Sequence, residues 1–236
     1  MLSFVKSDIG LIRKRNEDSF AFEPPHIFVV ADGMGGHVAG EIASATAASV
    51  VKDYCLSHLG DVHPQQLLEQ AILEANRIVF SKASLETEYA GMGTTVTAAF
   101  LTDSSLYWGH VGDSRLYYAY QDSMTQLTSD HTLVWEMMRN GAISPEEALI
   151  HPQRNMLTRA VGTTDYIRVE TGVCHYQDQS RFLLCTDGLT NMVADSTVAA
   201  LLLDRNLNGQ TILDTLVTEA NKAGGHDNVT AILLDL

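Results

Sequence analysis

Two apolar segments of this sequence end next to an aspartate, a residue type that can ligate a metal ion or move a proton. Residues 26–31 are followed by Asp32 and Gly33, and residues 181–186 are followed by Asp187. Short apolar runs of this composition predict buried strands. Each aspartate precedes a glycine, and Asp-Gly is also favourable turn chemistry, which explains either copy alone equally well. The repetition favours one acidic site that both strands share.

Three further aspartates lie beside predicted strand ends: Asp18, Asp113 and Asp227. Buried carboxylates at close range repel one another and hold their protons, so such a cluster persists mainly when cations neutralise it. Carboxylate oxygens are hard ligands that select Mg²⁺ or Mn²⁺. A pair of these ions about 3.5–4 Å apart can bridge a water and fix it for in-line attack on phosphorus. The pattern therefore predicts metal-dependent phosphoryl hydrolysis.

Residues 10–18 bring three cations, an asparagine and two carboxylates together at a predicted turn between strands. One interpretation is a solvated loop whose charges compensate each other, since surface ion pairs contribute roughly 0–1 kcal/mol. The other interpretation is functional. Glu17 or Asp18 would then join a metal site, while Arg13 or Arg15 would grip phosphate oxygens with its planar fork.

Several other chemistries do not match the sequence. A dinucleotide-binding turn needs the pattern GxGxxG, but residues 33–38 have valine at the third glycine position, and Asp32 would confront the pyrophosphate. A cysteine phosphatase needs Cys-x₅-Arg, and the interval from Cys174 to Arg181 is one residue too long. The sequence contains no Walker loop, kinase Asp-Phe-Gly or Gly-x-Ser-x-Gly elbow.

The elements that position these residues follow from the apolar periodicity. Strands are predicted near residues 2–9, 19–23, 26–31 and 94–101, on both sides of the turn at Asp113, near 167–174 and 181–186, and at the end of the chain. Helices are predicted at residues 41–59, 195–204 and 210–222. Two more are predicted to begin near residues 64 and 145, and another is predicted to end near residue 140. Strands dominate both ends, which favours an α+β fold with antiparallel sheets. Residues 135–165 are a candidate mobile flap, although an ordinary helical connection fits them equally well.

The composition limits the class of protein. A chain of 236 residues, 45% of them hydrophobic and without a Pro/Ser-rich linker, is expected to form one domain over residues 1–236. A net charge of −14 argues against binding to a nucleic-acid backbone. Neither a signal peptide nor a membrane span is expected. Cys55, Cys174 and Cys185 form no CxxC pair, which fits reduced thiols and predicts a cytoplasmic location.

Seven short motifs, in order along the whole chain, closely resemble the PPM/PP2C family of metal-dependent serine/threonine protein phosphatases, and most of all its stand-alone bacterial members. The motifs are Arg13-x-x-Asn16-Glu17-Asp18, Asp32-Gly33-Met34-Gly35-Gly36-His37, Gly93-Thr94-Thr95, Gly112-Asp113-Ser114-Arg115, Ser129-Asp130-His131, Thr186-Asp187-Gly188 and Asp227-Asn228-Val229-Thr230. The resemblance implies a four-layer αββα sandwich, with two antiparallel β-sheets flanked by helices. The flap near residues 135–165 matches the variable substrate-recognition element of the family.

The resemblance also implies a set of metal ligands. Asp32 would bridge two Mn²⁺ or Mg²⁺ ions, and the Gly33 carbonyl would bind one of them. Asp187 and Asp227 would hold the other ion. These four residues would form the core of the site.

Further roles come from the same resemblance. Glu17 and Asp18 would act on the metals directly or through water. Asp113 matches the position that, with Asp187, holds a third and weaker ion in bacterial relatives. Arg13 matches the arginine that binds the phosphate of the substrate.

The general acid is the least determined role. Many eukaryotic members carry histidine directly after the first Asp-Gly, where Met34 stands here, whereas the bacterial type carries it three residues later, as His37. A lone histidine is more often structural than catalytic. Either His37 or a metal-bound water would protonate the leaving alkoxide, and the sequence leaves both open.

The expected function is that of a phosphoric monoester hydrolase. It would release phosphate from phosphoserine and phosphothreonine in proteins by direct attack of a water bridged between two metal ions. The expected partners are phosphorylated proteins, the substrates of a bacterial serine/threonine kinase, with no nucleic acid or membrane involved, and the chain is expected to be a monomer.

Two alternatives stay open. One is a catalytically inactive adaptor on the same fold, acting through the flap face, although every matched acidic position is filled. The other is a metal nuclease with a similar acidic cluster, which the negative charge disfavours.

Overall fold

The protein consists of strands and helices whose bounds come from a computed structural model that describes residues 1–35 and 39–236. The strands are β1 (Leu2–Asp8), β2 (Asp18–Glu23), β3 (Ile27–Met34), β4 (Gly93–Thr94), β5 (Val96–Leu101), β6 (Ser105–Val111), β7 (Arg115–Tyr120), β8 (Ser123–Gln126), β9 (Glu170–His175), β10 (Arg181–Cys185) and β11 (Val229–Asp235). The helices are α1 (Ala39–Ser57), α2 (Pro64–Leu85), the 3₁₀ helix η1 (Thr87–Tyr89), α3 (Leu133–Arg139), α4 (Pro145–Ile150), α5 (Asp187–Thr190), α6 (Asp195–Leu203) and α7 (Gly209–Lys222).

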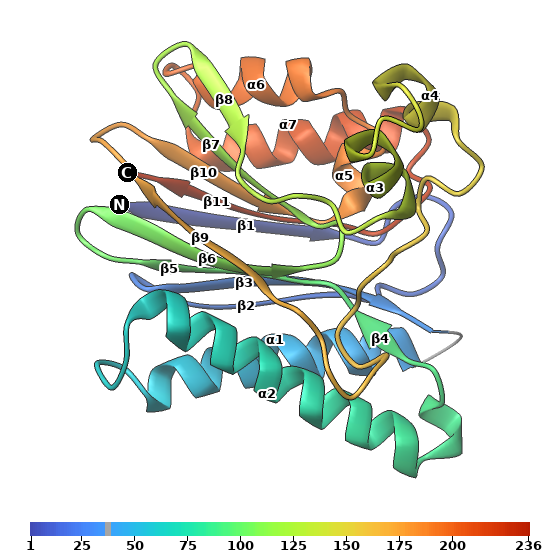
Figure 1. Ribbon diagram of the computed structural model, residues 1–236. Helices are drawn as coiled ribbons and strands as arrows, with labels where there is room; N and C mark the ends of the chain where they lie inside the picture. The colour runs from blue at the N-terminus through green and yellow to red at the C-terminus, as the bar shows by residue number, and fades with distance from the viewer. Residues whose placement is uncertain (36–38) are drawn as a thin grey trace.

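The strands form two antiparallel sheets that stack face to face, with helices on both outer sides (Figure 1). One sheet has the strand order β1-β11-β10-β7-β8. The other has the order β2-β3-β5-β6-β9, with the short strand β4 beside β3. Helices α6 and α7 cover the first sheet, and α1 and α2 cover the second. The predicted αββα sandwich is therefore confirmed.

Strand β3 shows why its sequence is apolar without alternation. Ile27, Val29 and Ala31 pack against helices α1 and α2, whereas Phe28 and Val30 pack between the two sheets. Successive side chains of a strand point to opposite faces, and here both faces are covered. A strand buried on both sides needs apolar residues at every position. This burial fixes the position of the acidic residue that follows.

The interior between the sheets is apolar as well. Leu106 and Trp108 of β6 contribute to it from one sheet, and Phe182, Leu184 and Ile232 contribute from the other. These side chains are almost completely buried. The two sheets are therefore held at a fixed separation, which allows loops from both of them to meet at one end of the sandwich.

Two boundaries near the predicted site differ from the prediction. Strand β3 does not end before Asp32 but continues to Met34, because its last two residues pair with β4. The tight turn predicted at the first Asp-Gly pair is therefore strand. Strand β10 ends at Cys185, and Asp187 is the first residue of helix α5 rather than a strand end.

The region predicted as a flap contains most of α3 and all of α4. A capping box begins α4, at the start predicted for this helix: Ser144 Oγ accepts from the Glu147 amide at 3.2 Å, and the Glu147 carboxylate accepts from the Ser144 amide at 2.7 Å. Leu149 and Ile150 of α4 are exposed. Both helices lie at the same end of the sandwich as α5 (Figure 1).

Candidate metal centre and active site

The acidic cluster begins where β2 and β3 pair. Asp18 and Asp32 lie directly opposite each other in the register of these strands. Asp18 is only 8% exposed, and its Oδ2 accepts a hydrogen bond of 2.8 Å from Thr186 Oγ1. Thr186 connects β10 to α5, so this bond ties the second sheet to the first beside the cluster.

Asp187 and Asp113 come to the cluster from other elements. Asp187 opens α5, and its Oδ2 accepts a hydrogen bond of 2.9 Å from Asn191 Nδ2. Asp113 follows β6 and the turn residue Gly112, whose φ of +117° is a conformation that side chains rarely adopt. A Cβ atom at Gly112 would also lie 2.6 Å from the Cβ of Thr95. The predicted turn at Asp113 is thus present and depends on glycine.

Asp227 lies in the loop before β11 and contacts the predicted phosphate-binding arginine. Its Oδ2 accepts from Arg13 Nη2 at 2.7 Å, and its Oδ1 accepts from the Asn228 amide at 2.8 Å. The Arg13 side chain is 48% exposed, so the pair lies where the cluster opens to solvent. Arg15, the other candidate, forms no ion pair among the residues that the structure describes.

Asn228 holds the loop that carries Arg13 and Glu17. Its Oδ1 accepts from the Glu17 amide at 2.8 Å, and its Nδ2 donates to the carbonyl oxygens of Ile9 and Arg15 at 2.9 Å. Asn228 is 3% exposed. Asn228 belongs to one of the sequence motifs but has no role predicted from the sequence, because its partners lie more than 200 residues away along the chain.

Burial and mutual repulsion raise the pKa values of the clustered carboxyl groups. Burial, helped by the charges of Asp187 and Asp227, raises the pKa of Asp18 to about 7. Burial and the charges of Asp18, Asp187 and Asp113 raise the pKa of Asp32 well above its usual range. The pKa values of Asp187 and Asp113 are raised mainly by burial as well. Without cations, the cluster therefore holds protons.

The donor atoms of the cluster fit a divalent metal. Among the described residues, the Oδ1 atoms of Asp18 and Asp187 are buried and have no hydrogen-bond partner. Such atoms are costly to bury, and a hard cation bound by carboxylate oxygens satisfies them. A Cβ atom at Gly33 would collide with the carbonyl oxygens of Gly40 and Glu17, so only glycine fits at that position.

We expect the metal-free protein to lose stability as the pH rises. The unfolded pKa of an aspartate is about 3.9, so ionising Asp18 in the fold costs stability between that value and its folded pKa of about 7. Thermal unfolding in EDTA should show a Tm lower by roughly 5–10 °C at pH 8 than at pH 5. Asp18→Asn, or added Mn²⁺, should remove much of this difference. An unchanged or rising Tm over the same range would contradict the prediction.

One predicted site residue lies outside the described residues. This residue is His37, and its role as general acid stays a prediction. Glu17 is placed at the cluster, where burial, with a smaller contribution from Asp227, raises its pKa despite the opposing charge of Arg13.

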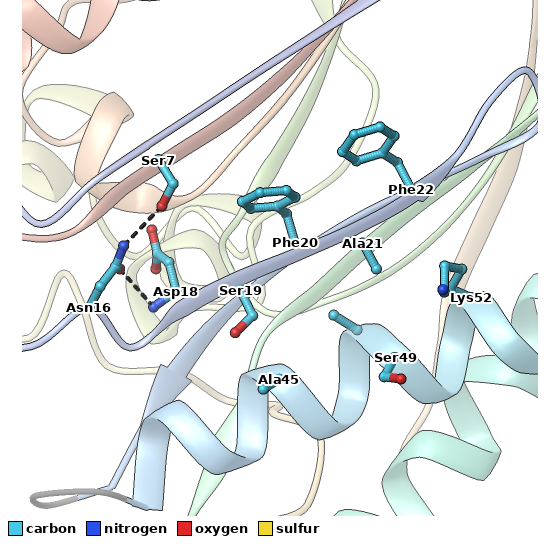
Figure 2. Close-up of a pocket in the computed structure, with 11 residues that line it drawn as sticks. Ser7, Asn16, Asp18, Ser19, Phe20, Ala21, Phe22, Ala45, Ser49 and Lys52 are labelled. Carbon is cyan, nitrogen blue, oxygen red and sulfur yellow. Dashed lines mark hydrogen bonds between the residues drawn. The ribbon is translucent and has the colours of Figure 1, made fainter.

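A groove of about 570 Å³ runs along the outer side of β2 and reaches the cluster only through Asp18 (Figure 2). Asn16 holds that end by donating to Ser7 Oγ at 2.9 Å and accepting from the Asp18 amide at 3.2 Å. The rest of the groove is lined by Phe20, Phe22 and small side chains of α1. Asp18 is the one acidic residue among the described residues that line this groove, so the groove is distinct from the aspartate cluster.

A second group of side chains has the types that can bind a metal ion: His110, His131 and Glu170. It lies next to Gly112, the turn residue that precedes Asp113. Its nitrogen atoms already have partners. His110 bonds to Thr97 Oγ1 at 2.8 Å, and His131 bonds to the Gly112 amide at 3.1 Å and to Glu170 at 3.2 Å. Burial lowers the pKa of His110 to about 3, so its ring is neutral. This group is a hydrogen-bond network that supports the Gly112 turn.

Comparisons with known proteins agree with this geometry. The sequence profile of the protein phosphatase 2C family matches residues 13–211. The serine/threonine phosphatase stp of Listeria innocua serovar 6a is 38% identical over 237 residues, which cover 98% of this chain and 94% of the relative. The crystal structure of serine/threonine phosphatase Stp1 from Staphylococcus aureus has a TM-score of 0.91 at 33% identity, covering 99% of this chain and 94% of that one. The catalytic domain of the serine/threonine protein phosphatase PstP, solved with two manganese ions, has a TM-score of 0.86 at 33% identity and covers 99% and 97%.

Two stacked antiparallel sheets with carboxylates gathered at one end define the class of metal-dependent phosphatases. The chain belongs to the protein phosphatase 2C family of serine/threonine protein phosphatases and is similar to bacterial members of it. It is an enzyme that acts on phosphoproteins. The adaptor alternative receives no support, since these relatives are named as phosphatases. In the described residues, no helix is long and apolar enough to cross a membrane.

Proposed function

We propose that residues 1–236 act as one catalytic domain that uses two Mn²⁺ or Mg²⁺ ions at the aspartate cluster, with a third ion at Asp113. The convergence of carboxyl groups with raised pKa values and two buried oxygens without partners carries this proposal. The two manganese ions of the related PstP domain support the choice of metal. When bound, such ions neutralise the phosphate charge and activate a water for direct attack on phosphorus.

The proposed ligands follow from the sequence match and from the positions of the side chains. Asp32 would be shared by the two core ions, the Gly33 carbonyl would bind one of them, and Asp187 and Asp227 would bind the other. Glu17 and Asp18 would act directly or through water, and Asp113 with Asp187 would hold the third ion. Asp18 is already oriented by Thr186, and Asp187 by Asn191, so these carboxylates need little rearrangement to bind a cation.

The proposed contribution of the chain to substrate binding centres on Arg13. Its guanidinium group is half-exposed beside Asp227 and can present two donors to a phosphate. The loop that carries it is fixed by Asn228, which reduces the entropy lost on binding. The proton for the leaving alkoxide comes from His37 or from a bound water.

Arg13→Ala should chiefly raise KM, because it removes phosphate binding in the ground state as well as in the transition state. We expect KM for a phosphothreonine peptide to rise by roughly tenfold, with a smaller change in kcat, and Arg13→Lys to restore part of the affinity. Steady-state kinetics at saturating Mn²⁺ measures both constants. A large fall in kcat with unchanged KM would argue against this role.

The proposed partners are proteins phosphorylated by a serine/threonine kinase of the same bacterial cell, bound as substrates by a monomeric phosphatase in the cytoplasm. The free thiols, two of them buried, support a reducing compartment. The substrate class is tested by the release of phosphate from phosphoserine, phosphothreonine and phosphotyrosine peptides of one sequence. Turnover of the first two is expected, and turnover of phosphotyrosine alone would contradict the proposal.

A further inference from the structure

A pocket of about 330 Å³ lies between α3 and the start of β9. Three of its lining residues are arginines: Arg139, Arg159 and Arg168. Among the residues that the structure describes, none of their guanidinium groups forms an ion pair with a carboxylate. In a chain of net charge −14, a concave site with three such cations is a local centre of anion attraction.

Arg159 has a donor without an acceptor inside the pocket. Its Nη1 lies 3.4 Å from His131 Nε2. The Nδ1 atom of His131 accepts from the Gly112 amide, so the ring hydrogen is on Nε2, which donates to Glu170 at 3.2 Å. A nitrogen that carries a hydrogen cannot accept another one. Among the described residues, this Arg159 nitrogen therefore has no acceptor, and it can donate to solvent or to a bound anion.

Helix α3 contributes two of the lining residues, Trp135 and Arg139. Trp135 and Arg139 are four residues apart and share one face of the helix. Among the described residues, the buried Trp135 Nε1 has no hydrogen-bond partner. Of the three acids in the lining, Asp130 is paired with Arg115, which lies outside it. Glu170 and Glu136 remain, so the three arginines exceed these carboxylates by one. Glu136 is exposed.

The pocket is close to the metal centre. The His131 amide donates to the Gly112 carbonyl at 2.7 Å, and Gly112 immediately precedes Asp113. His131, which lines the pocket, is therefore bonded directly to the turn that carries Asp113. A peptide whose phosphoresidue lies at the cluster would then have a neighbouring residue near the pocket.

We propose that this pocket is a subsite for a second phosphate group on the substrate, a few residues from the phosphate that is removed. A phosphate dianion matches the planar guanidinium forks and takes several donors at once, which a single carboxylate does less well. The kinetic consequence rests on the proposed phosphatase function, whereas the binding of the anion does not. The protein would thereby prefer multiply phosphorylated segments.

Binding is tested first, without catalysis, on the Asp32→Ala variant in EDTA. Titration with a peptide that carries one phosphoserine should change the fluorescence of Trp135, and Trp135→Phe should abolish the signal. Arg139→Ala with Arg168→Ala should weaken binding by about tenfold or more. Arg154→Ala, an exposed arginine of the flap outside the pocket, is the matched control and should bind as before. Inorganic phosphate alone is the second probe, and its binding without peptide binding would overturn a substrate subsite.

Kinetics then use peptides with one phosphothreonine and a second residue that is phosphoserine, glutamate or alanine. The second residue is placed about two to six positions away, which spans roughly 7–20 Å of extended chain. We expect kcat/KM to be about tenfold higher for phosphoserine than for alanine at the best spacing, and the double arginine variant to lose this preference while keeping its activity on the alanine peptide. An equal preference for glutamate, or no preference at any spacing, would overturn the proposal. If no peptide is hydrolysed at all, the phosphatase assignment fails and the fluorescence result stands separately.

Discussion

Asp32→Ala should abolish the turnover of a phosphothreonine peptide while leaving the protein folded. Asp32 lies opposite Asp18, and the charges of Asp18, Asp187 and Asp113 all act on its carboxyl group, so it is central to the cluster. Its removal should weaken metal binding and lower kcat by a factor on the order of 10⁴ or more, because hydrolysis of monoesters is extremely slow without the metals.

The same variant should be at least as stable as the wild type in EDTA. The fold buries Asp32 against other acids at a cost, which appears as its raised pKa, and alanine removes that cost. Phosphate release in Mn²⁺ and a thermal melt in EDTA measure the two effects. Asp122→Ala, at an exposed turn, is the control and should change neither. Turnover close to that of the wild type would rule out the assignment of Asp32.

Asn228→Ala should destabilise the protein and impair substrate binding together. The change removes one acceptor and two donors from the loop that carries Arg13 and Glu17, and leaves three partly buried backbone groups without these partners. We expect a loss of about 3 kcal/mol in the free energy of unfolding, from roughly 1 kcal/mol for each bond. KM should rise because Arg13 is no longer held beside Asp227.

Chemical denaturation and steady-state kinetics at a temperature where the variant is folded test these two effects. Asn206→Ala, at an exposed position after α6, is the matched control and should cost a few tenths of a kcal/mol. A variant that loses stability but keeps the wild-type KM would show that Asn228 supports the fold without positioning Arg13.

Much of this architecture could be predicted because it depends on local signals. The double burial of β3 makes residues 27–31 apolar throughout, and the Ser144 capping box marks the start of α4. The predicted aspartates are brought together because each lies next to a turn or a strand boundary at one end of the sandwich.

Other features depend on partners that are distant in the sequence. Strand β3 extends through Gly33 because β4, some sixty residues later in the chain, supplies hydrogen bonds. Strand β8 has only four residues with alternating exposure and exists because it pairs with β7. The role of Asn228 requires that the first and last loops of the chain meet, which no local pattern reveals.

The central claim is that the aspartate cluster is a metal centre that hydrolyses phosphate esters. The most direct measurement is phosphate release from a phosphothreonine peptide by the metal-stripped protein, before and after addition of Mn²⁺. The account predicts almost no release without the metal and a return of activity with it. Equal release in both conditions, or no release from a folded protein that binds Mn²⁺, would contradict it.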